Sequence, residues 1–106
     1  MGAHGTALGM ALGANIGTFR GRTRVEQLAR EDWASVTFKG ARYRLGITLE
    51  GAGAVAFAAD LLERLSELDL PIPGCIVADI ALVAEGRRDD GAYAYLEVEA
   101  LTIEEN

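Results

Sequence analysis

The chain is predicted to form an α+β domain in which an antiparallel sheet carries helices on one face only. Three observations lead to this prediction: apolar and polar residues alternate over 34–49 and again over 76–103, and an apolar period of 3.6 residues lies between them over 53–68. The 106 residues suffice for one domain, 1–106, with a single core. Half of the residues are hydrophobic and a quarter are charged, so composition excludes wholesale disorder and a coiled-coil rod.

Residues 1–21 form a glycine-rich segment that can be interpreted in two ways. Glycine recurs at every fourth position from Gly5 to Gly21. Alternation over 6–12 favours a strand, which would lie in the centre of the sheet. An apolar stripe at helical spacing is also present, formed by Leu8, Leu12, Ile16 and Phe19. We prefer the strand because each glycine in a helix interior costs about 1 kcal/mol. The segment is alternatively an arm that packs against a neighbouring subunit.

A short helix is predicted over 24–31, because Thr23 and Glu26 have the spacing of a capping box. Two half-buried strands follow over 34–39 and 42–49, joined by a two-residue turn at Gly40-Ala41. This register pairs Phe38 with Tyr43, Val36 with Leu45 and Ala34 with Ile47. The opposite face then collects four aromatic or basic residues: Trp33, Lys39, Arg42 and Arg44.

The main helix is predicted over 53–68, and a loop with two prolines ends it. The last hairpin is predicted to turn through a three-residue loop, 89–91, because this register separates apolar from acidic residues. It pairs Ala84 with Leu96, Leu82 with Val98 and Ile80 with Ala100. The outer face of the hairpin would carry Val77, Asp79, Val83, Glu85, Arg87, Tyr93, Tyr95, Glu97, Glu99, Leu101 and Ile103.

The elements in this order predict a ferredoxin-like antiparallel sheet, βαββαβ, with one extra C-terminal strand. Without the N-terminal strand, a ββαββ sheet with one main helix remains, and Glu97 and Glu99 would neighbour Arg42 and Arg44 directly. Either arrangement leaves one face of the sheet without helices. The apolar and aromatic content of that face predicts a two-fold homodimer that covers it.

The net charge of −6 is distributed unevenly along the chain. Residues 1–44 hold seven basic and three acidic residues, whereas 45–106 hold three basic and thirteen acidic ones. Seven scattered cations do not supply the excess needed to neutralise phosphates, so we expect no nucleic-acid partner. Glycines dilute the N-terminal segment too much for a membrane span, and we expect no membrane partner. Cys75 is the only cysteine, which fits a reducing cytoplasm.

The chain offers few groups for catalysis. His4 is the only histidine, so one chain cannot build a histidine relay or a typical zinc site. We therefore predict no catalytic residue, no metal site and no cofactor. The candidate ligand or interface residues are instead those expected on the uncovered sheet face: Trp33, Arg42, Arg44, Tyr93, Tyr95, Glu97 and Glu99.

The leading functional hypothesis is a small non-catalytic homodimeric module. It would bind a partner protein or a small apolar or anionic ligand through the uncovered sheet face. One alternative is a cofactor-independent enzyme of the isomerase or oxygenase type, with a pocket between sheet and helix. Another is a pure assembly protein. Ligand binding and catalysis both require a roomy pocket with converging polar groups, whereas assembly requires a filled core and a large interface.

Overall fold

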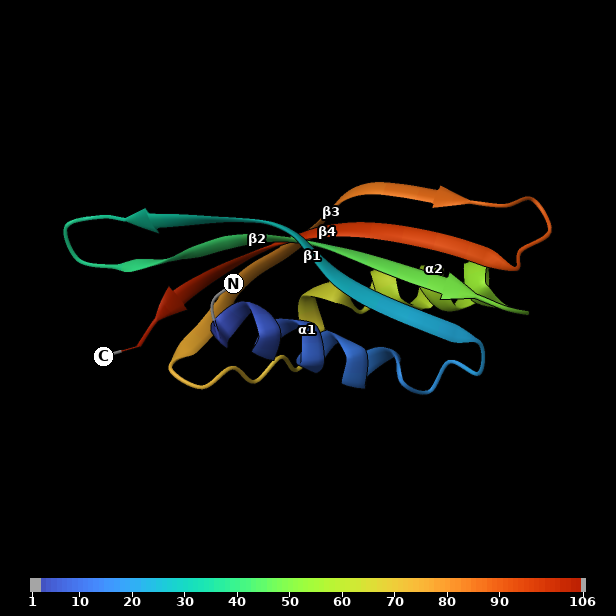
Figure 1. Cartoon of the computed structure of the whole chain (residues 1–106), viewed down its shortest axis with the longest axis horizontal. Helices are drawn as coiled ribbons and strands as arrows, with labels where there is room; N and C mark the ends of the chain where they lie inside the picture. Colours follow the sequence, from blue (N-terminus) through green and yellow to red (C-terminus); the bar gives the residue numbers. More distant parts are fainter. Residues whose placement is uncertain (1–2, 106) are drawn as a thin grey trace.

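Two helices lie on one face of a four-stranded antiparallel sheet in the structure, a computed structural model that describes residues 3–105 (Figure 1). The elements follow one another as α1 (Ala3–Ile16), β1 (Arg22–Ala34), β2 (Lys39–Glu50), α2 (Ala54–Glu63), η1 (Leu65–Glu67), β3 (Cys75–Arg87) and β4 (Tyr93–Glu104). The strand order is β1-β2-β4-β3. Because β2 and β3 both run antiparallel to β4, they run parallel to each other, and α2 lies on the crossover between them.

The α+β class and the placement of the helices on one face agree with the prediction, but the order of the elements does not. A helix, and not a strand, precedes β1, so the predicted βαββαβ order with an extra strand is not observed. The four strands and α2 occur in the order of the alternative ββαββ arrangement, with α1 in front of them. The strands of 12 or 13 residues make the molecule elongated, with extents of 49 × 24 × 22 Å.

The strand predicted over 6–12 is wrong, because this segment belongs to α1. The side chains of Leu8, Leu12 and Ile16 share one side of α1 and are fully buried in the core. Burial of a large aliphatic side chain contributes about 1.5–3 kcal/mol, whereas each of the helix's interior glycines costs about 1 kcal/mol. Burial of the stripe therefore outweighs the poor helix propensity of the segment.

The helix predicted over 24–31 is also wrong: this segment is part of β1, which pairs with β2 along its length. A helix of eight residues is marginal by itself, whereas the ladder with β2 satisfies the backbone of the whole segment. The hairpin turn lies over 35–38 and not at Gly40-Ala41, since Ala34 pairs with Lys39. The backbone N–H of Ser35 donates to the carbonyl oxygen of Phe38 at 2.7 Å, and this bond closes the turn.

The second half of the chain follows the prediction more closely. The main helix is observed as α2 with η1 after it, and the pairs Ile80–Ala100 and Leu82–Val98 are present. The predicted pair Ala84–Leu96 is wrong, because a β-bulge after Leu82 places Glu85 opposite Leu96. This bulge turns Glu85 and Arg87, which were predicted on the outer face, to the helix-covered side, and a second bulge between Val77 and Asp79 does the same for Val77.

Side chains of β2 and β4 form the centre of the core. Alternate residues of these strands are buried against the helices: Ala41, Tyr43, Leu45, Ile47, Leu49, Ala94, Leu96, Val98, Ala100 and Thr102. Residues of α2 complete the core, among them Ala54, Ala58 and Leu61. Because directly paired residues of antiparallel strands share a face, the intervening residues of β2 and β4 point away from the helices.

The packing of α1 predicts that Leu12→Ala lowers the free energy of unfolding by about 2–5 kcal/mol, because it leaves a cavity beneath the helix. Met10→Ala is the matched control, since Met10 lies on the same helix and is 72% exposed; its effect should stay within about 0.5 kcal/mol. Urea denaturation followed by circular dichroism measures both. Equal effects of the two substitutions would contradict the observed packing of α1.

Candidate functional site

The sheet face opposite the helices, called the open face below, is the candidate functional site. Its central residues come from β2 and β4: Arg42, Arg44, Gly46, Thr48, Tyr93, Tyr95, Glu97, Glu99, Leu101 and Ile103. The outer strands add Arg24, Glu26, Glu31 and Trp33 from β1, and Ile76, Asp79, Ala81, Ala84 and Gly86 from β3. All seven candidate residues predicted from the sequence therefore lie on one face. Lys39 does not, because it lies on the helix side, where its Nζ is 3.9 Å from Glu104.

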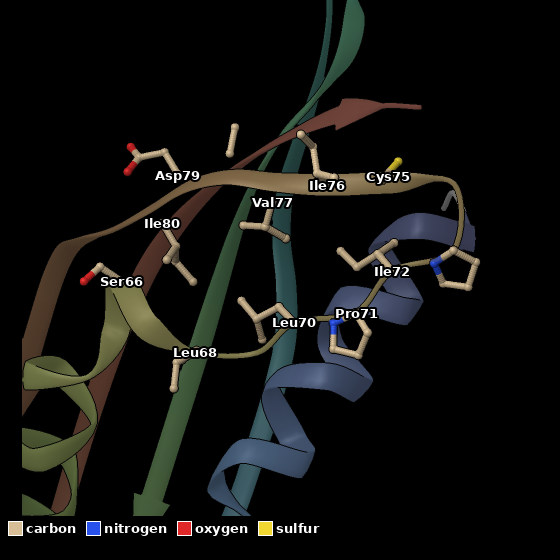
Figure 2. A pocket seen from close by; sticks show the side chains of 12 residues that line it. Ser66, Leu68, Leu70, Pro71, Ile72, Cys75, Ile76, Val77, Asp79 and Ile80 are labelled. Carbon is tan, nitrogen blue, oxygen red and sulfur yellow. The ribbon is translucent and has the colours of Figure 1, made fainter. Parts of the chain in front are cut away.

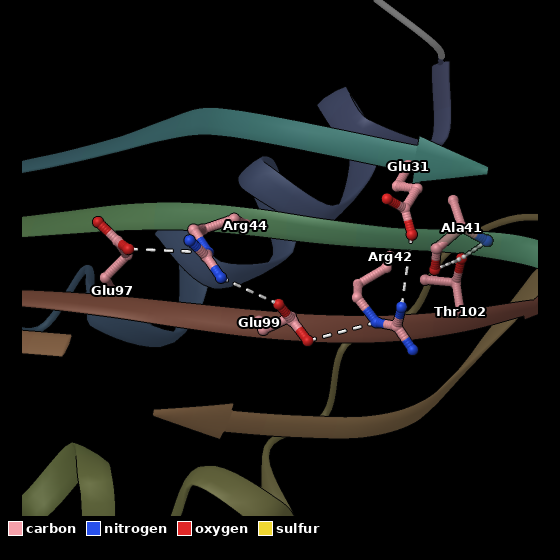
Figure 3. A network of polar contacts seen from close by, with 7 residues as sticks. All are labelled: Glu31, Ala41, Arg42, Arg44, Glu97, Glu99 and Thr102. Atoms are coloured by element: carbon pink, nitrogen blue, oxygen red, sulfur yellow. Dashed lines mark hydrogen bonds and ion pairs between the residues drawn. The ribbon is translucent and has the colours of Figure 1, made fainter. Parts of the chain in front are cut away.

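Four ion pairs link three strands at the centre of the open face (Figure 3). The guanidinium of Arg42 is 3.3 Å from Glu99 and 3.6 Å from Glu31. The guanidinium of Arg44 is 3.3 Å from Glu99 and 3.7 Å from Glu97. All five side chains retain access to solvent, and such pairs typically contribute about 0–1 kcal/mol each to stability. The ion-pair cluster is therefore better placed for recognition than for holding the fold together.

A β-bulge in β1 determines which of its side chains reach the ion-pair cluster. The register shifts between Gln27 and Ala29, so that Glu31 pairs with Arg42 and Trp33 with Gly40. Without this extra residue, alternation would turn Glu31 and Trp33 to the helix side. The bulge thus supplies the third carboxylate of the cluster and one aromatic residue of the open face.

Two features position Tyr95 on the open face. Its hydroxyl makes a hydrogen bond, and Gly46 beneath the ring has no side chain. Its hydroxyl donates to Glu97 Oε1 at 2.9 Å. This hydrogen bond to a carboxylate, together with burial, raises the pKa of Tyr95. A Cβ at Gly46 would lie 3.0 Å from Tyr95 Oη and 3.4 Å from Leu28 Cδ1. Gly46 therefore provides the space for the ring, and a glycine inside an alternating strand is the sequence signal for such a close approach.

Apolar and aromatic residues occupy both ends of the open face. At one end, the register places Trp33, Gly40, Ile103 and Ile76 in one row across the four strands. Trp33 is half-buried and its Nε1 has no hydrogen-bond partner, while Ile76 is 49% exposed. At the other end, the guanidinium of Arg88 lies 5.4 Å from the ring centre of Tyr93. The open face thus has a charged centre, an apolar row at one end and tyrosine beside arginine at the other.

A groove of about 700 Å³ lies on another part of the molecule, between the start of β3 and the segment 66–73 (Figure 2). Leu70, Ile72, Val77 and Ile80 line it, whereas Asp79 points away from Leu70. Acid–base catalysis needs polar groups that converge on one point. The groove has the size expected for a ligand site, but its apolar lining does not supply that arrangement.

Tyr43 lies in the core behind the open face. Its side chain is fully buried and its hydroxyl has no hydrogen-bond partner, and burial raises its pKa. The guanidinium of Arg30 lies 5.5 Å from the centre of the Tyr43 ring and also hydrogen-bonds Asp32 at 2.9 Å. The pKa values of Tyr43 and Arg30 are both raised, which takes these two groups further from proton transfer near neutral pH.

Comparison with protein-family models gives no match, and comparison with curated proteins finds no similar chain. Among the side chains that the structure describes, those of residues 7–105, no group of three or more histidine, cysteine or acidic residues is arranged to hold a metal ion. None of the helices in the described part of the chain is long and apolar enough to cross a membrane.

The hydrogen bond between Tyr95 and Glu97 predicts that Glu97→Gln lowers the pKa of Tyr95 toward its ordinary value of about 10. Because the folded-state pKa is raised, the bond stabilises the protein below pH of about 10, and this contribution is lost as the pH rises through the folded pKa. NMR titration of ring-labelled tyrosine measures the shift. Glu99→Gln is the control, and an equal change of the Tyr95 pKa in both variants would contradict the assignment.

Proposed function

We propose that the protein is a non-catalytic homodimeric module whose open face binds another protein surface. The observation that carries the proposal is the combination of a charged centre with an apolar row at one end, on a sheet face that the described chain leaves uncovered. Protein interfaces typically have aromatic and arginine residues as anchors and place them beside polar groups that set orientation. Trp33, Tyr95, Arg42 and Arg44 supply both kinds of group on one surface.

The size of the open face also supports the proposal. Four strands with a spacing of about 4.8 Å and a length of about 40 Å define a surface of roughly 750 Å². Specific interfaces typically bury about 800 Å² on each partner. One open face is therefore large enough for a stable dimer, without any contribution from the helices.

The two alternative functions receive less support. An enzyme would need polar groups converging in a cavity, and the large groove beside β3 is lined by apolar side chains. An assembly arm would need a free N-terminal segment, whereas Leu8, Leu12 and Ile16 pack α1 onto its own sheet. Binding through the open face requires neither feature.

A ferredoxin-like relationship is part of the proposal. Moving the first strand of a βαββαβ chain to its C-terminal end produces the order αββαββ, which is the observed order of elements. The antiparallel sheet with both helices on one face supports this relationship. It leaves the open face available for pairing with a second sheet.

Native mass spectrometry of the purified protein tests the proposed function, and we expect a dimer. Trp33→Ala should weaken that dimer at least about tenfold, since it removes an aromatic anchor from the open face. Met10→Ala, which truncates an exposed apolar residue on α1, is the control and should leave the dimer unchanged. A monomeric wild-type protein, or an equally stable Trp33→Ala dimer, would contradict the proposal. An added mass on the dimer would indicate a bound small molecule.

A further inference from the structure

The charges at the centre of the open face are sorted by strand. The central guanidinium groups, Arg42 and Arg44, both belong to β2, whereas the central carboxylates, Glu97 and Glu99, both belong to β4. At this centre each strand of the pair therefore carries one sign of charge, and Glu50 lies apart from it at the end of β2. A second copy of the chain offers the same two stripes, so the open face is complementary to itself only in certain orientations.

We propose that a second copy covers the open face about a two-fold axis that runs parallel to the strands, midway between β2 and β4. This inference rests on the proposed function. Rotation about such an axis exchanges β2 with β4 and leaves positions along the strands unchanged. Because Arg44 and Glu99 are paired residues in one chain, the rotation places Arg44 over Glu99 of the partner subunit, and symmetry repeats the contact.

The other simple orientation brings like charges together. A two-fold axis in the plane of the face but perpendicular to the strands would stack β2 on β2 and β4 on β4. The arginines of β2 would then face β2 of the partner subunit, and Glu97 would lie near Glu99 of the partner subunit. Like charges at an interface repel each other and disfavour this orientation. The sorting of charge by strand therefore selects the axis parallel to the strands.

The outer strands fit the same axis, which places β1 over β3 of the partner subunit. Besides Ile76 and Asp79, the open face of β3 carries small residues, Ala81, Ala84 and Gly86, whereas β1 carries larger ones, including Leu28 and Trp33. Trp33 would lie over Ile76 of the partner subunit, because both belong to the terminal row. Large side chains thus meet small or apolar ones along both edges, apart from the contact of Glu31 with Asp79 of the partner subunit.

The β-bulge after Leu82 in β3 contributes to this fit. It turns Glu85 and Arg87 to the helix side, where they line a small cavity beside α2. Without the bulge, alternation would place both charges on the open face. A like-charged pair, Glu31 with Asp79 of the partner subunit, meets at the rim. Glu31 is 75% exposed there and is already paired with Arg42.

The ion-pair cluster retains hydrogen-bonding capacity for a partner's carboxylates. Arg44 uses Nε toward Glu97 and Nη2 toward Glu99, and a guanidinium has five N–H donors in total. Glu99 retains 33% exposure of its side chain, and Arg44 retains 44%. Bridging two copies would therefore extend the existing cluster, which lowers the cost of burying its charges.

The orientation is tested by the single substitution Glu99→Arg. With the axis parallel to the strands, it places an arginine over Arg44 of the partner subunit twice, and the dissociation constant should rise at least about tenfold. With the perpendicular axis, the new arginine would lie near the partner's Glu97, and the dimer should tighten. Sedimentation equilibrium at low salt measures the constant. Glu63→Arg, the same charge change at an exposed position on α2, is the control and should have little effect.

A mixing experiment separates repulsion between subunits from damage within one subunit. Arg44→Glu and Glu99→Arg copies should each dimerise poorly alone but form a heterodimer together, because both cross-subunit contacts then join opposite charges. The proposed axis would be overturned if the Glu99→Arg dimer were as stable as the wild-type dimer or more stable, or if the mixture formed no preferential heterodimer. Neither result would contradict the proposed dimer itself. A wild-type protein that stays monomeric would instead overturn the proposed function itself.

Discussion

The antiparallel pairing of β2 with β4 is the interaction on which the rest of the structure depends. It joins two hairpins that are each local in sequence, and it extends from Gly40–Ile103 to Glu50–Tyr93. One side of this ladder holds the aliphatic core, and the other side holds the ion-pair cluster. Because strand side chains alternate with a period of two, one register determines both surfaces at once, and a slip of one residue would exchange them.

β-Bulges in the outer strands change which of their side chains lie on the open face. The bulge in β1 brings Glu31 and Trp33 to the open face, and the bulge after Leu82 in β3 removes Glu85 and Arg87 from it. Together they place bulky groups along one edge and small residues along the other. Bulges also interrupt the regular hydrogen-bonding edge of a strand, which protects long edge strands from unwanted pairing. The same irregularities therefore shape the candidate site and limit edge-to-edge association.

The open face combines two kinds of contact with different physical roles. Exposed ion pairs contribute little to the stability of one chain, but they penalise a partner that presents the wrong charge. Apolar anchors such as Trp33 and Ile76 supply affinity without orientation. A charged centre beside an apolar row thus suits the proposed role of the open face, which is to recognise one orientation of one partner.

The two central strands and the faces of their side chains could be predicted from the sequence, because strict alternation in β2 and β4 leaves one way to separate apolar from charged residues. Their direct pairing was expected only in the alternative ββαββ arrangement. The same alternation placed six of the seven candidate residues on one face, and Trp33 joins them through the bulge in β1. The conformations of α1 and β1 depended on tertiary structure. The glycines of α1 and the capping box in the β1 segment are local signals worth about 1 kcal/mol each. Burial of α1 against the sheet outweighs the first, and pairing of β1 with β2 outweighs the second. The bulges have no local signal at all. The sequence by itself therefore determined which residues avoid water, and only the tertiary structure decided which neighbours they meet.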